Sequence, residues 1–196
     1  MQIFNVGSDA INIYLIDSGS HRLLIDSGFP NKLNDLGREM RKTGFKIRDI
    51  DYLIVTHFHI DHAGAIQELK EQGVKFILFD IQIGHIGSME RMAIGKWEYL
   101  QLNMRDNIIM SIDKSTDFLN KMGLQAQVIS TPGHSDDSIT LLFNSGEAFI
   151  GDLCADYLAD DKDSINYKTW IKLKGANARI IYPSHGKVYE IKSTYT

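Results

Sequence analysis

Residues 52–62 read Tyr-Leu-Ile-Val-Thr-His-Phe-His-Ile-Asp-His, an apolar run that continues directly into a cluster of histidine and aspartate. The run is apolar on successive residues from Tyr52 to Val55, which predicts a strand that is covered on both faces. Neutral imidazoles and an ionised carboxylate are ligand types that suit zinc and similar transition metals. The stretch therefore predicts a buried strand that ends at a metal site, with these candidate ligands: His57, His59, Asp61 and His62.

Three more candidate ligands follow later apolar segments of the chain. His134 stands in Thr-Pro-Gly-His, Asp152 in Ile-Gly-Asp, and His185 in Tyr-Pro-Ser-His-Gly. Each comes in the loop after the C-terminal end of a predicted strand, where the loops of open α/β sheets converge on ligands. We therefore expect these residues to meet the first cluster in space, so that one site holds five of the seven histidines.

The composition is that of an ordinary folded domain. A length of 196 residues suits one domain over 1–196, and the interleaving of predicted strands and helices indicates an α/β sandwich. The net charge of -4 gives no broad basic surface, so neither nucleic acid nor a membrane is an expected partner. The chain has one cysteine, no secretory signal and no apolar run of roughly 20 residues, which favours a cytoplasmic location.

Residues 84–123 differ from the rest of the chain. They combine five methionines with Trp97 and Tyr99 in weakly amphipathic helical patterns. One interpretation is a helical pair that faces the core. Another is a lid beside the metals, where flexible methionines would admit varied apolar substrates. A third is the interface of a homodimer. Ser115 or Thr116 is expected to cap the last helix of this segment, and Ser164 a final helix of the chain.

The spacing of the ligands indicates two neighbouring metal positions. In an extended segment residues two apart point the same way, so His57 and His59 can share one metal. Asp61 and His62 lie at the start of the next helix, turned towards a second position, and the two oxygens of Asp152 can bridge the two. Two divalent ions roughly 3.5–4 Å apart would hold a hydroxide between them, because metal binding lowers the pKa of water to about 7.

These motifs, taken in order, resemble those of the metallo-β-lactamase superfamily. The resemblance rests on H-x-H-x-D-H, Thr-Pro-Gly-His, Gly-Asp after a strand, a strand-terminal His before Gly, and the early Leu-Ile-Asp-Ser-Gly of residues 24–28. It spans residues 24–186 and implies an αββα sandwich, with two mixed sheets, helices on the outer faces and the metals at one edge. It also implies the ligand sets. Metal 1 takes His57, His59 and His134, metal 2 takes Asp61, His62 and His185, and Asp152 bridges.

Differences between the motifs of this chain and those of known branches of the superfamily reduce the number of subgroups that it resembles. The commonest drug-degrading β-lactamases resemble H-x-H-x-D-R without a bridging aspartate, and His62 and Asp152 argue against them. Flavodiiron oxidases resemble H-x-E-x-D, and His59 disfavours them. Glyoxalase II enzymes share all seven ligands, but residues 153–156 read Leu-Cys-Ala-Asp in place of their Gly- and Arg-containing motif, and no C-terminal helical domain follows. Residues 135–138 also differ from the usual thioesterase motif. Small single-domain hydrolases and lactonase-like enzymes remain.

The expected function is that of a dinuclear hydrolase acting on a small molecule. The bridging hydroxide would attack the carbonyl of an ester, thioester or lactone, and Asp61 would be the catalytic residue that orients the hydroxide and passes on its proton. Zinc is the expected metal, although the same ligands suit iron or manganese. Three alternatives stay open: a phosphodiesterase or nuclease, an iron-dependent persulfide dioxygenase, and a catalytically silent metal-binding protein.

Several other residues are candidates for supporting roles. Asp26, Thr56 and Asp136 could accept a hydrogen bond from the second ring nitrogen of a ligating histidine. Cys154 is interpreted as a small buried hydrophobic residue rather than a ligand. Tyr157 is interpreted as a surface residue rather than a donor to the substrate.

Overall fold

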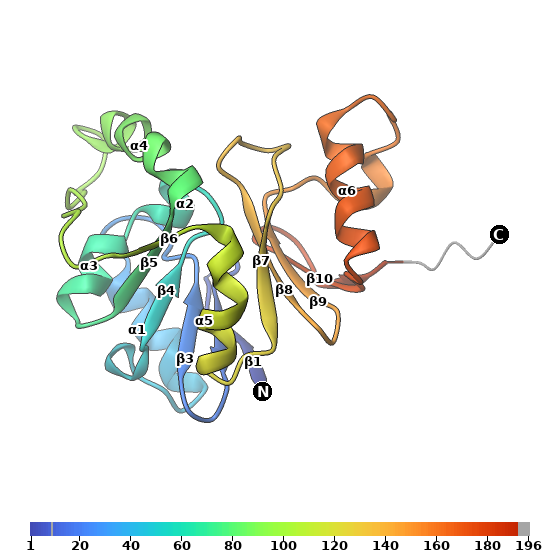
Figure 1. The fold of residues 1–196 in the computed structure, drawn as a ribbon. Helices are drawn as coiled ribbons and strands as arrows, with labels where there is room; N and C mark the ends of the chain where they lie inside the picture. Colours follow the sequence, from blue (N-terminus) through green and yellow to red (C-terminus); the bar gives the residue numbers. More distant parts are fainter. Residues whose placement is uncertain (9, 192–196) are drawn as a thin grey trace.

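Two β-sheets stand face to face in the computed structural model, which describes residues 1–8 and 10–191 (Figure 1). The first sheet has the order β1 (Gln2–Asn5), β2 (Tyr14–Asp17), β3 (Arg22–Ile25), β4 (Tyr52–Ile54), β5 (Lys75–Phe79) and β6 (Ile108–Met110). Its first three strands are antiparallel and the rest run parallel. The second sheet has the order β11 (Tyr189–Glu190), β10 (Ile180–Pro183), β9 (Glu147–Gly151), β8 (Ile139–Phe143) and β7 (Ala126–Ser130). Here only β9 and β10 pair in parallel, so both sheets are mixed.

Helices cover the outer faces of the two sheets, and one helix packs against the cluster between them. The helices are α1 (Leu33–Lys42), α2 (Ile60–Ala63), α3 (Ile66–Glu71), α4 (Ile86–Ala93), α5 (Ser115–Lys121) and α6 (Ile165–Gly175), with short 3-10 turns η1 (Ile47–Asp49), η2 (Asp80–His85), η3 (Ile112–Lys114) and η4 (Asp156–Leu158). Helices α1, α3 and α4 lie on the side of the first sheet and α6 on the far side of the second (Figure 1). The expected αββα sandwich is confirmed.

The alternation of side chains along the strands builds three buried layers. In β3, Leu23 and Ile25 belong to the cluster between the sheets, whereas Leu24 belongs to the cluster under α1 and α3. In β8, Leu141 faces the space between the sheets and Leu142 packs towards α6. Successive residues of a strand point to opposite faces, so a strand that is apolar at every position is buried on both sides.

Residues 84–123 contain the helices α4 and α5, but they do not form the simple helical pair that was one interpretation of their sequence. Strand β6 lies within them and extends the first sheet by pairing in parallel with β5, Ile77 opposite Ile108. Of the methionines on α4, Met89 is buried in the core beneath the helix, whereas Met92 is 49% exposed. One face of the segment therefore packs in the core, and its roles as a lid or as a dimer interface stay predictions.

The two helix-cap predictions have different outcomes. Ser164 precedes α6 and its side chain accepts a hydrogen bond from the Tyr167 amide, as predicted. The prediction for Ser115 or Thr116 is wrong, because Lys114 occupies the cap position of α5. The Ser115 hydroxyl instead accepts a hydrogen bond from the Val128 amide and ties α5 to β7. Within residues 1–8 and 10–191, no helix has the length and apolar character needed to cross a bilayer.

Candidate metal centre

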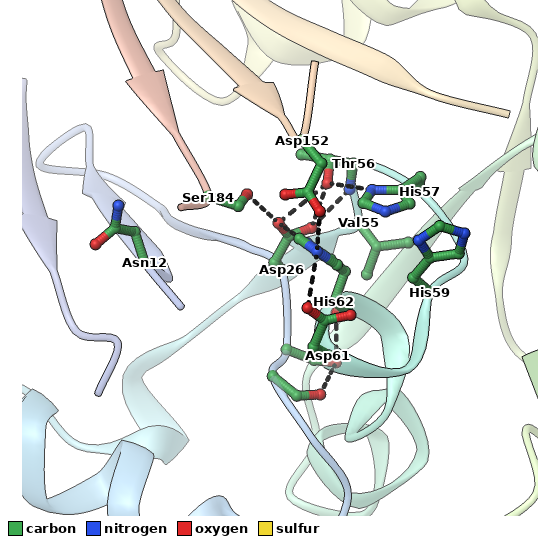
Figure 2. Close-up of polar contacts among 12 residues, drawn as sticks. Asn12, Asp26, Val55, Thr56, His57, His59, Asp61, His62, Asp152 and Ser184 are labelled. Atoms are coloured by element: carbon green, nitrogen blue, oxygen red, sulfur yellow. Dashed lines mark hydrogen bonds and ion pairs between the residues drawn. The ribbon is translucent and has the colours of Figure 1, made fainter. Parts of the chain in front are cut away.

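All seven candidate ligands lie at one edge of the sandwich. His57 follows β4, His134 follows β7, Asp152 follows β9 and His185 follows β10, so strand ends of both sheets converge there. The other three candidates lie on the loop and first turn that lead into α2, namely His59, Asp61 and His62. Figure 2 shows His57, His59, His62, Asp61 and Asp152 pointing towards a common centre.

The first group consists of His57, His59 and His134, one ring nitrogen of each lying within 4.8 Å of the others. The Nε2 atom of His134 is 3.0 Å from Nδ1 of His59. His57 is fully buried, His59 is half-buried and His134 lies at the rim. Three imidazoles thus face one point from two loops.

The second group consists of Asp61, His62, Asp152 and His185, again with ligand atoms within 4.8 Å of one another. The Nε2 atom of His185 lies 3.3 Å from Oδ2 of Asp61 and 3.5 Å from Oδ1 of Asp152. The Nε2 atom of His62 is 3.4 Å from the same Asp61 oxygen. This group mixes carboxylates with imidazoles, unlike the first.

Asp152 contacts both groups. Its Oδ2 atom lies 3.3 Å from Nε2 of His62, in the second group, and 3.6 Å from Nε2 of His134, in the first. The structure therefore brings all seven predicted residues together, in the division that the family resemblance implied. Their roles as metal ligands stay a prediction.

Within the part of the chain that the structure describes, three buried atoms at this centre lack a hydrogen-bond partner. They are Nε2 of His57, Nε2 of His62 and Oδ1 of Asp152. Buried polar atoms are nearly always partnered, because an unpartnered one loses its interaction with water and gains nothing in return. Imidazole nitrogens and carboxylate oxygens are also the donor set of zinc and related ions. The residues present fit divalent cations.

A buried carboxylate, Asp26, connects β3 to the ligand loops. Its Oδ1 atom accepts hydrogen bonds from the Thr56 amide at 2.7 Å and from the Thr56 hydroxyl at 3.0 Å. Its Oδ2 atom accepts from Nδ1 of His62 and from the Ser184 hydroxyl, each at 2.9 Å (Figure 2). The Thr56 hydroxyl is also 3.1 Å from Nδ1 of His57. Asp26 and Thr56 thus contact the histidines that are candidate ligands, as predicted.

The prediction that Asp136 contacts one of these histidines is wrong. Asp136 is exposed, whereas its neighbour Asp137 is only 2% exposed and accepts a hydrogen bond from the Phe58 amide at 2.7 Å. Nδ1 of His85 lies 3.7 Å from the other oxygen of Asp137. In the sequence both aspartates stand in one polar run, and their burial depends on how the loop closes. The sequence signal that could have pointed to Asp137 is that this polar run directly follows His134.

Cys154 and Tyr157 follow Asp152 but lie in neither group. Cys154 is half-buried against the cluster beneath α6, and burial raises the pKa of its thiol. Tyr157 is 74% exposed. Both residues fit the interpretations made from the sequence.

Burial and neighbouring charges set the protonation of the centre. Burial, reinforced by the positive charge that His62 and other nearby imidazoles can carry, lowers the pKa of His57 far below its usual value. Burial also disfavours the charged form of His62, but the carboxylates of Asp26, Asp152 and Asp61 outweigh it and raise the pKa of His62 to about 12. Against the opposing effect of burial, His62 and His185 lower the pKa of Asp61 to about 2.

The fold and the clustered side chains place the protein in a known class. The sequence profile of the metallo-beta-lactamase superfamily matches residues 6–185, and the chain belongs to this family. Among solved structures, it is similar to the FEZ-1 metallo-β-lactamase from Legionella gormanii with a TM-score of 0.71. That likeness covers 93% of this chain and 76% of the other at 23% sequence identity, and it shows the shared fold.

Two curated relatives resemble the chain over most of its length. A beta-lactamase-like protein 2 homolog of Drosophila melanogaster is 28% identical over 184 residues, which cover 91% of this chain and 59% of the relative. An atrochrysone carboxyl ACP thioesterase of Aspergillus fumigatus is also 28% identical over 184 residues, covering 91% of this chain and 51% of the enzyme. The chain thus spans between half and three-fifths of the length of these relatives.

Proposed function

We propose that the chain is a dinuclear metal-dependent hydrolase that cleaves the carbonyl group of a small ester, thioester or lactone. The observation that carries the proposal is the meeting of the two ligand groups at Asp152, where three buried polar atoms lack partners. Members of the superfamily are generally hydrolytic, and one relative is named as a thioesterase. These similarities favour attack on a carbonyl.

Two cations would divide the seven side chains between them. His57, His59 and His134 would hold the first, and Asp61, His62 and His185 the second. Asp152 would bridge, since its Oδ2 atom contacts both groups. When bound, two divalent cations, which we propose to be zinc, supply a Lewis acid and lower the pKa of water to about 7.

The protein itself would orient the water and the ligands. The pKa of Asp61 is about 2, so this carboxylate is ionised at neutral pH and can accept a hydrogen bond from water at the centre. Asp26 accepts a hydrogen bond from Nδ1 of His62, which directs Nε2 of that ring towards Asp61 and Asp152. A partner on one ring nitrogen fixes the orientation with which the other meets a metal.

A cavity next to the second group offers room for part of a small substrate. Its volume is about 270 Å³, and its lining combines apolar residues such as Ile11 and Phe29 with the charged Lys32, Asp35 and Arg38. Two other lining residues contact the ligands, because the Ser27 hydroxyl donates to the His62 carbonyl and the Ala10 carbonyl lies 2.6 Å from Nδ1 of His185. We propose that the apolar part of the substrate enters here, as is usual for small-molecule sites.

The test combines elemental analysis of the purified protein with a substrate panel. We expect two equivalents of metal per chain and hydrolysis of a thioester or a lactone that stops after chelation and returns on adding zinc. Cleavage of a phosphodiester alone would replace this proposal with a nuclease. Oxygen consumption with a persulfide and iron would replace it with a dioxygenase. A melting temperature that falls on chelation, without hydrolysis of any substrate, would indicate a silent metal-binding protein.

A further inference from the structure

Besides Asp26, a second buried carboxylate contacts the ligand loops. Asp137 is 2% exposed and its Oδ2 atom accepts a hydrogen bond from the Phe58 amide at 2.7 Å. Phe58 lies between His57 and His59, so this bond holds the backbone that carries both imidazoles of the first group.

Asp137 also belongs to the loop that carries the third imidazole. It comes three residues after His134, and this loop is closed by a contact of 2.8 Å between the hydroxyls of Ser135 and Ser138. A backbone bond from the Ile139 amide to the Thr56 carbonyl, 2.9 Å long, joins the same two loops just beside the carboxylate. The contact between Asp137 and Phe58 therefore joins the loop of His134 to the loop of His57 and His59. It helps to determine how far His134 lies from the other two imidazoles.

The surroundings hold the Asp137 residue in place. Gln82, which is fully buried, donates from its side chain to the Val55 carbonyl at 3.0 Å and to the Asp137 carbonyl at 3.5 Å. Nδ1 of His85 lies 3.7 Å from Oδ1 of the carboxylate. Both residues belong to η2, so this 3-10 turn packs against the two ligand loops.

We propose that Asp137 is a positioning residue that sets the geometry of the first ligand group by binding the Phe58 amide. The inference rests on the proposed metal centre, but it concerns cation binding and not hydrolysis. Asp26 supports His62 of the second group, whereas Asp137 supports the loops of His57, His59 and His134. The two carboxylates therefore serve different halves of the centre.

The test is a titration of the chelator-treated full chain with Zn²⁺, in competition with an indicator of known affinity. Histidine-selective NMR assigns each equivalent of metal to its imidazoles. In Asp137→Ala the Phe58 amide loses its acceptor, and we expect the zinc affinity of the first group to fall about 10- to 100-fold, the range typical for partners around metal ligands. The affinity of the second group should change less than that of the first.

Two further variants separate geometry from charge. Asp137→Asn keeps an oxygen at the same distance, so we expect it to stay closer to the wild type than Asp137→Glu, which keeps the charge but displaces the oxygens. This comparison holds even if Asp137→Ala does not fold. Asp136→Ala removes the exposed neighbouring carboxylate and serves as the matched control, with no change in affinity.

Three results would overturn the assignment. The first is an unchanged zinc affinity of the first group in Asp137→Ala. The second is an equal loss at both groups, which would indicate a general loss of structure. The third is Asp137→Glu lying closer to the wild type than Asp137→Asn, which would mean that charge and not position matters. The zinc titration uses no substrate. A failure to observe the proposed hydrolysis would therefore not affect this test.

Discussion

The two ligand groups lie side by side but are built differently. The first consists of imidazoles alone, and burial together with the neighbouring rings keeps His57 neutral. The second places two carboxylates against His62, whose pKa they raise to about 12. The first group can therefore accept a cation without losing a proton from His57. The second must exchange the proton of His62 for the cation. The two halves should bind metal with different pH dependence and rely on different supporting residues.

Asp152→Ala should have the largest effect, because Asp152 contacts both groups. We expect the rate of thioester or lactone hydrolysis to fall on the order of a thousandfold, equivalent to about 4 kcal/mol of barrier. The far-UV circular dichroism spectrum should hardly change. Asp160→Ala, on an exposed site of the same loop, is the control. Full activity of the Asp152 variant would remove the basis for treating the groups as one centre.

Asp26→Asn should affect the zinc affinities of the two ligand groups differently. The amide can still accept from Thr56, but it no longer offers two carboxylate oxygens to Thr56, His62 and Ser184. We expect the zinc affinity of the second group to fall about 10- to 100-fold and that of the first to change less. Titration with histidine-selective NMR measures both. Asp51→Asn, which alters a carboxylate bound to the Arg22 amide outside the centre, is the control. A larger loss at the first group would contradict the division.

Proton release should differ between the two binding steps. His62 has a pKa of about 12, so it carries a proton at neutral pH that a cation must displace. The affinity of the second group should therefore rise with pH by about tenfold per unit, because one proton is exchanged for each metal. Calorimetry of zinc binding in buffers of different ionisation enthalpy measures the protons released. Release of no proton at the second group would show that His62 is neutral before metal binds.

The acid stability of the chelator-treated protein should depend on Asp61 in the second group. The pKa of Asp61 is about 2 in the folded protein, against a usual 3.8. A lowered carboxyl pKa stabilises the fold above the unfolded-state pKa, and this contribution disappears as the pH falls from about 4 towards 2. Asp61→Asn should therefore cost roughly 1–2 kcal/mol at pH 6 and less at pH 2.5, as measured by urea unfolding. An equal cost at both pH values would mean that ionisation of Asp61 plays no part.

The residues of the candidate metal centre could be predicted from the sequence because their signals are local. Apolar runs such as residues 52–55 mark buried strands, and His57, Asp152 and His185 come just after such runs. The division of the ligands into two groups came from the family resemblance and agrees with their positions in the structure. Residue type and spacing were sufficient for these inferences, because the sheets themselves bring the strand ends together.

Features that depend on contacts between distant segments could not be predicted. Strand β6 is three residues long and exists because it pairs with β5, so its sequence looked like part of a helical region. Helices α2 and α3 are separate elements, and between them Gly64 packs against Pro30, more than thirty residues away in the sequence. The choice between Asp136 and Asp137 likewise depends on which side chain reaches the Phe58 amide.

The most direct test of the two-cation account is the rate of thioester or lactone hydrolysis as Zn²⁺ is added to the chelator-treated protein. The rate should rise from near zero and reach its plateau at two equivalents per chain, since both ligand groups are needed. A plateau at one equivalent, or hydrolysis that continues in the presence of the chelator, would contradict it.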